Sequence, residues 1–133
     1  MDCFEYGDVP PPPHPSKNFT YTITHVAVIT TVPHILANAV VNFYGAGITE
    51  TKRDKYVIKV DTKVGCLRCT MRVQVYKCAA NGYVVEFMRW GGAPMAFCAK
   101  VRECCGFLNR YFHLVNAPCL VPIVIPLPPE ASD

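Results

Sequence analysis

The clearest pattern in the chain is an almost perfect alternation of apolar and polar residues across residues 66–78. A period of two predicts a strand with one face towards a core and the other towards water. The apolar side is Leu67, Cys69, Met71, Val73 and Val75, and the polar side is Arg68, Thr70, Arg72 and Gln74. This strand predicts a sheet that is covered on one face only.

Three further segments read as strands of the same sheet. They are residues 19–30, which alternate in the same way, residues 54–61 and residues 83–90. The Asn81-Gly82 pair before the last of them is typical of a hairpin turn. We therefore expect residues 83–90 to return antiparallel to residues 66–78.

Two segments instead follow the helical period of 3.6 residues. Thr31 is a candidate cap of the first helix, Pro33 fits its first turn, and Gly45 or Gly47 ends it. Its apolar stripe is Ile35, Leu36, Ala39, Val40 and Phe43. The second helix begins at Pro94 and carries on one side Phe97, Cys98, Val101, Cys104, Cys105 and Leu108.

The order strand, helix, strand, strand, strand, helix predicts an α+β fold. Two amphipathic helices are enough to cover one face of the sheet, which gives a two-layer sandwich with a four-stranded, mainly antiparallel sheet and both helices on one face. The other sheet face would be polar and somewhat basic. It would show Thr20, Thr22, Lys59, Arg68, Thr70, Arg72, Gln74, Glu86 and Met88.

Both ends of the chain are rich in proline, so we place one domain at residues 18–115 between two tails. Residues 1–17 are expected to be a stiff, extended N-terminal extension, because proline has no N–H donor and favours the polyproline conformation. Residues 116–133 are apolar yet interrupted by proline. Such a segment should lie across the domain surface or be captured by a partner.

The eight cysteines do not predict a disulfide framework. The acidic start MDCFEYGD is unlike a secretory leader, so we expect a reducing compartment and cysteines that pack as small apolar residues. Cys66 and Cys69 have zinc-knuckle spacing, but no second pair follows. No nucleophile–base pair or pair of acids stands out, so we expect no metal, no cofactor and no catalytic activity.

Basic residues are concentrated in the middle of the chain. Residues 17–115 hold all 13 Lys and Arg against five Asp and Glu, a net charge of +8, whereas the whole chain has +3. A basic body favours anionic partners such as lipid headgroups, acidic proteins or nucleic acid. RNA is the least favoured of these, because the expected outer sheet face is mainly Thr, Arg and Gln rather than aromatic. We see no transmembrane segment.

The Gly91-Gly92 pair lies between a strand and a helix, which is where phosphate loops occur. Neither the GxxxxGK[ST] nor the GxGxxG spacing is present. We therefore interpret the pair as a tight strand-to-helix corner. Weak attraction of an anion by Arg89 and the following helix N-terminus is the alternative.

From Phe19 to about Leu108 the chain resembles the kinase-associated 1 domain, which ends the microtubule-affinity-regulating kinases and has relatives in the AMP-activated kinase α-subunit. The likeness lies in FTYTI, RDKYVIKV and MRVQVYKC, and above all in NGYVVEFMRWGGAPMAFCAKV. There the family typically shows N-G-[apolar]-x-F-[basic]-R-x-S-G-x-x-x-x-F. The matching positions are Val85, Phe87, Arg89, Gly92 and Phe97.

The resemblance implies a non-catalytic regulatory module with the same fold. It also implies binding of anionic phospholipid such as phosphatidylserine through scattered basic residues, or packing on a kinase, here in trans. The family positions carry over to Arg89, Lys52, Arg53 and Lys55, and charge alone adds Arg68 and Arg72.

We therefore expect a cytoplasmic module, peripheral at membranes, that is recruited to an anionic phospholipid surface or to a protein partner. Two alternatives stay open. One is a protein–protein interaction or adaptor subunit that uses the C-terminal tail and the groove beneath it. The other is RNA binding on the basic sheet face.

Overall fold

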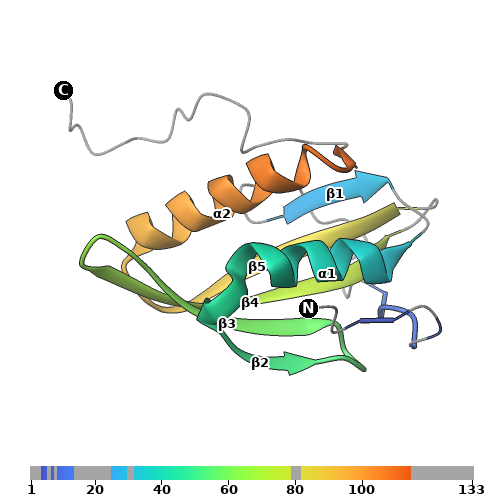
Figure 1. Cartoon of the computed structure of the whole chain (residues 1–133), viewed down its shortest axis with the longest axis horizontal. Coiled ribbons are helices and arrows are strands. Elements are labelled where there is room, and N and C mark those ends of the chain that lie inside the picture. Colours follow the sequence, from blue (N-terminus) through green and yellow to red (C-terminus); the bar gives the residue numbers. More distant parts are fainter. Residues whose placement is uncertain are drawn as a thin grey trace.

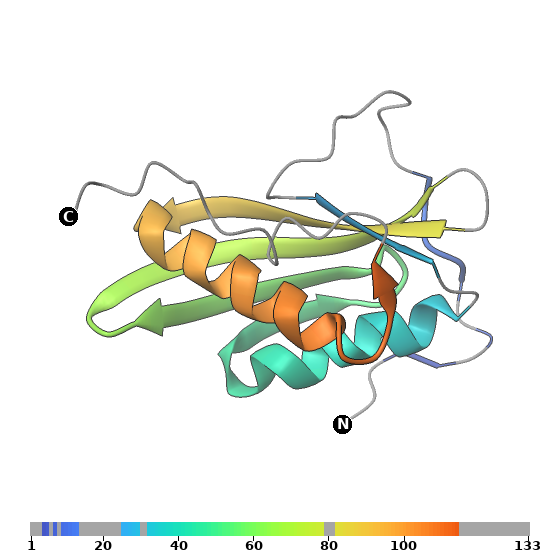
Figure 2. The ribbon, with the colours of Figure 1, turned by 90° about the horizontal axis from the view of Figure 1, so that it is seen from above.

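The computed structural model describes residues 4, 5, 7, 9–13, 25–29, 32–78 and 82–114. In these residues the chain has an α+β fold, in which two helices cover one face of an open antiparallel sheet (Figures 1 and 2). The order of strands across the sheet is β2-β3-β4-β5-β1-β6. The predicted fold class and the placement of both helices on one face are confirmed.

All neighbouring strands of the sheet are antiparallel, and the ladder of β4 and β5 lies at its centre. Their bounds are β1 His25–Ile29, β2 Ile48–Lys52, β3 Val57–Val64, β4 Leu67–Cys78, β5 Gly82–Gly92 and β6 His113–Leu114. β4 and β5, with 12 and 11 residues, are the longest strands.

The prediction of four strands was wrong, because β2 and the two-residue β6 extend the two edges of the sheet. β2 has the sequence ITETK, and none of its five residues is fully buried. An edge strand of this kind has no apolar face to reveal it in the sequence. It forms because β3 offers it a free edge across the turn at residues 53–56.

Several predicted features lie outside the described residues. These are the start of the first strand with Thr20 and Thr22, the Thr31 cap, Asn81 of the hairpin turn and the tail at residues 116–133. The hairpin itself is present in the pairing of its strands, since Cys78 lies opposite Gly82.

The helices are α1 (Pro33–Tyr44), the short 3-10 helix η1 (Gly45–Gly47) and α2 (Pro94–Leu108). Each α-helix begins at a proline, and Gly45, with φ of 53°, ends α1 as predicted. The predicted stripe of α2 is buried except Cys98, which is half-buried. In α1 the prediction was wrong for Ile35, which is 49% exposed because it faces an open groove beside α2.

The core lies between the sheet and the helices. Into it β4 directs Cys69, Met71, Val73 and Val75, which confirms the predicted alternation. Leu67 belongs to the same side by alternation but is 42% exposed. The reason is visible in Figure 2, where the β3–β4 hairpin extends beyond the helices.

The N-terminal segment contributes to this core. Phe4 is fully buried, and its ring stacks on that of Tyr56 with 4.9 Å between centroids. The Asn38 side chain accepts a hydrogen bond from the Phe4 N–H at 2.9 Å and donates one to the Phe4 carbonyl at 2.7 Å. The Lys77 N–H donates to the Pro12 carbonyl at 2.7 Å. The described part of the proline-rich segment therefore packs on the domain.

Candidate functional site

The six basic residues predicted for an anion site lie in three separate places. Lys52, Arg53 and Lys55 lie in or next to the β2–β3 turn. Arg72 lies on the outer face of the sheet. Arg68 and Arg89 lie on β4 and β5, towards the end of these strands that is next to α2. Arg68 lies opposite Lys63, six residues along β3 from the partner of Lys52, which is about 20 Å of strand. Arg89 pairs with Met71 opposite Val60 in the middle of β3, three strands across the sheet from Lys52. One small ligand cannot contact both the first and the third place.

Acids lie beside Lys52 and Arg53 in the β2–β3 turn. The Arg53 guanidinium lies 3.8 Å from the Glu5 carboxylate. An open depression of about 460 Å³ next to the turn is lined by Lys52 and Arg53 but also by Asp54. These acids reduce the positive potential that an anionic ligand would meet there.

The outer face of the sheet has its charges paired. The Lys59 ammonium lies 3.1 Å from the Glu50 carboxylate and 5.0 Å from the centre of the Trp90 ring. The Arg72 guanidinium lies 3.8 Å from the Glu86 carboxylate. The hydrogen bond from Lys59 lowers the pKa of Glu50. These pairs reduce the positive potential at the middle of this face.

The third place is the end of the β3–β4 hairpin, where β5 turns into α2. The Ala93 N–H donates to the Arg68 carbonyl at 2.8 Å, and the Arg89 guanidinium donates to the Gly92 carbonyl at 2.9 Å. The Arg68 side chain is 73% exposed and lies 3.3 Å from Asp61. Lys63 lies directly opposite Arg68 in the strand register, whereas Arg89 pairs with Met71, three residues further along β4 and on the helix side of the sheet.

Exposed apolar side chains gather at the same end. Val64 and Leu67 lie opposite each other at the last pair of the ladder, on either side of the exposed Cys66. Met95, in the first turn of α2, is 58% exposed. We call these residues together with the three cations the hairpin end: Lys63, Val64, Cys66, Leu67, Arg68, Arg89 and Met95.

The sequence missed the apolar part of the hairpin end. Alternation assigns Leu67 to the core side, and only the length of the hairpin beyond the helices exposes it (Figure 1). One signal was available: the turn at Gly65 is flanked by Val64 and Cys66 instead of the polar residues usual in a turn.

The described cysteines form neither a metal site nor a disulfide. Cys66 is exposed in the turn and Cys69 is buried in the core, so the two do not converge. No group of three or more His, Cys, Asp or Glu that could hold a metal is found in the described ranges. Burial raises the pKa of the Cys69 thiol, which keeps it in the unreactive protonated form at neutral pH.

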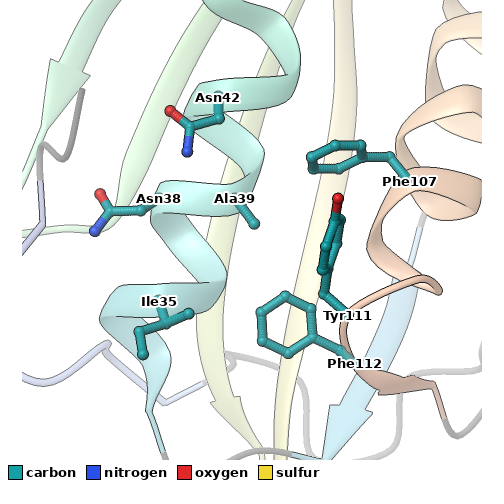
Figure 3. Close-up of a pocket in the computed structure, with 7 residues that line it drawn as sticks. All are labelled: Ile35, Asn38, Ala39, Asn42, Phe107, Tyr111 and Phe112. Atoms are coloured by element: carbon teal, nitrogen blue, oxygen red, sulfur yellow. The ribbon is translucent and has the colours of Figure 1, made fainter.

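A groove of about 320 Å³ lies between α1 and α2 (Figure 3). One wall is α1, and the other is the end of α2 and the turn after it, where three aromatic rings face α1. Phe107 packs against Phe43 at 5.4 Å and Tyr111 at 5.3 Å between ring centroids. The lining residues are Ile35, Asn38, Ala39, Asn42, Phe107, Tyr111 and Phe112.

No family model matches the chain, and no curated protein is similar enough to indicate a relationship. Within the described residues, neither helix combines the length and the apolar character needed to cross a bilayer. What the chain binds must therefore follow from its own surfaces, of which the hairpin end and the interhelical groove are the most distinctive.

Proposed function

We propose that the protein is a non-catalytic binding module that docks on anionic membrane surfaces through the hairpin end. The observation that carries this proposal is that the exposed Val64 and Leu67 lie at the tip of the β3–β4 hairpin next to the pair Lys63 and Arg68, with Arg89 further back, shortly before β5 leads into α2. Apolar side chains can enter the headgroup region while Lys and Arg at the same level attract anionic lipids. Arg89 is also a position that the resemblance to the kinase-associated 1 domain assigns to phospholipid.

The shape of the hairpin end supports this mode of binding. Val64 and Leu67 project from the same side of the β3–β4 ladder, and Gly65, with φ of 62°, turns the chain tightly between them. In Figure 1 the hairpin projects from the body next to the start of α2. Its tip can therefore reach a flat surface without hindrance from the remaining described elements.

The expected affinity is modest. Each Lys or Arg near an anionic leaflet contributes about 1 kcal/mol, and partial insertion of two aliphatic side chains adds ~2–3 kcal/mol. The total corresponds to a dissociation constant on the order of 0.1 mM in accessible lipid. Binding of this strength is reversible and would need a second contact for lasting recruitment.

Flotation with vesicles tests the proposal. The full chain should float with vesicles that contain phosphatidylserine and not with vesicles of phosphatidylcholine alone. Changing Lys63, Arg68 and Arg89 to Glu should weaken binding by at least about 100-fold, since three favourable contacts become repulsive. Changing Val64 and Leu67 to Ser should weaken it by about 30- to 150-fold, since the ~2–3 kcal/mol from insertion is lost.

The matched control is the same change of charge at the opposite end of β3. The variant with Lys52, Arg53 and Lys55 changed to Glu has the same net charge as the hairpin variant, but it should keep most of the binding. Equal loss in both variants would show that only the overall charge matters. Unchanged binding of the hairpin variant would refute the site.

A further inference from the structure

We infer that the groove between α1 and α2 is the docking site of the chain's own C-terminal segment, residues 120–127, bound in an extended polyproline-like conformation. This inference does not depend on membrane binding, because the groove and the hairpin end share no residue. It follows from the chemistry of the groove, the sequence of the segment and the place where the described chain ends.

The groove presents more apolar surface than its position requires. Tyr111 is 65% exposed and Ile35 is 49% exposed, and they line the groove together with the rings of Phe107 and Phe112. Figure 3 shows Ile35 on one wall and the three rings on the other, with no described side chain between them. Exposed apolar surface gathered in a concave site is typical of a binding groove.

The C-terminal segment has a matching composition. Residues 120–127 read LVPIVIPL and contain no polar side chain. Pro122 and Pro126 remove N–H donors and exclude both a helix and a central strand, so the segment is expected to be extended. Proline-containing extended segments are bound by aromatic-lined grooves, which accept a conformation that is already restricted.

The connection between segment and groove is short. Phe112 lines the groove, and the described chain ends two residues later at Leu114. The five residues 115–119 can span up to about 17 Å, which allows residue 120 to return to the groove. Eight residues in the polyproline conformation extend over about 25 Å, and the 12 residues of α1 over about 18 Å, so the segment can cover the whole groove.

Docking within one chain does not require high affinity. A short flexible connection gives the segment an effective concentration in the millimolar range at the groove. Even a groove that binds the free segment with a dissociation constant of about 0.1 mM would then be occupied most of the time. A partner protein would have to present a similar apolar, proline-containing segment and displace the chain's own.

Limited proteolysis of the full chain tests this inference. Thermolysin can cut before Val124, so the rate of cleavage within residues 120–127 reports how often the segment leaves the groove. Changing Ile35 and Tyr111 to Ser should raise this rate at least tenfold. Ile35 is about half exposed and Tyr111 about two-thirds exposed, so the variant should keep the thermal transition of the parent. The control, with Val9 and Met88 changed to Ser, removes equally exposed apolar groups elsewhere and should be cut at the parental rate.

Two results would overturn the inference. One is equal cleavage of the parent and the groove variant. The other is protection that increases with protein concentration, which would assign the bound segment to a second copy of the chain. Nuclear Overhauser contacts between the methyl groups of Ile123, Val124 or Ile125 and the rings of Phe107 and Phe112 are expected in the parent. Their absence would likewise overturn it, even if the groove variant failed to fold.

Discussion

At the residue scale, Gly92 shows why the glycine pair is a corner and not a phosphate cradle. Its φ is 85°, and a Cβ at this position would collide with the Arg68 carbonyl oxygen and lie 2.8 Å from the Cys69 Cα. Gly91 has no such neighbour. A glycine is therefore needed at position 92 because the backbones of β4 and β5 approach each other closely there. This agrees with the interpretation of a tight corner.

Gly92→Ala should lower the free energy of unfolding by about 3 kcal/mol, because it combines a strained φ with a backbone collision. Gly91→Ala, one residue away, should change it by less than about 1 kcal/mol. Urea denaturation of both variants measures the difference. Equal effects would mean that β5 can move away from β4 at little cost.

Phe4 is a second residue whose role depends on a distant contact. Phe4→Ala should cost about 3–5 kcal/mol, since the ring is fully buried against Tyr56. Val9→Ala, in the same segment but at an exposed position, should be nearly neutral. A Phe4→Ala variant with parental stability in thermal denaturation would show that the N-terminal segment does not belong to the folded unit.

At the element scale, Tyr44 joins the two helices. It is the last residue of α1, and its hydroxyl donates to the Lys100 carbonyl of α2 at 3.4 Å. Burial raises the pKa of the Tyr44 phenol well above its usual value, and the Cys104 thiol nearby acts in the same direction. The packed helices therefore favour the neutral phenol.

The sign of the pH dependence follows from this raised pKa. Tyr44 in the unfolded chain loses its proton near pH 10, while the folded protein holds it. Stability should thus be unaffected by this group below pH 10 and should fall above it, by up to about 1.4 kcal/mol per pH unit. Tyr44→Phe should flatten this alkaline decline in urea titrations between pH 9 and 11. An unchanged decline would contradict the assignment.

At the scale of the whole molecule, stability should be graded from the centre of the sheet to its edges. β4 is paired on both sides and directs four fully buried side chains into the core, whereas β2 has one neighbour and no fully buried side chain. Amide hydrogen exchange should therefore be slowest in β4 and at least 100-fold faster in β2. Equal protection of the two strands would mean that another part of the chain covers the β2 edge.

The prediction from sequence was good where the signal is local. The alternation in β4 and the helical period of α2 identified both elements and their buried faces, because each face is set by neighbours along the chain. β2 was missed because its own sequence carries no such local signal. Its five residues show no apolar period, and only an edge offered by β3 makes them a strand.

In the candidate site, too, the residues could be proposed from the sequence, but their arrangement in space could not. Arg68 and Arg89 could be proposed from charge and from the family resemblance. Their separation from Lys52 could not, because it depends on the order and register of the strands that carry them. The exposure of Leu67 and of Ile35 also contradicts their periods, since exposure depends on whether a second element covers them.

By itself, the sequence determined the antiparallel hairpins, the two amphipathic helices and the α+β class. These follow from dihedral preferences and side-chain periods, which act between residues a few positions apart. Only the tertiary structure decided that the cations divide among separate places, that Phe4 enters the core and that an aromatic groove stays open between the helices. Burial and charge pairing are properties of surfaces that meet in space, and residues far apart in the sequence create them.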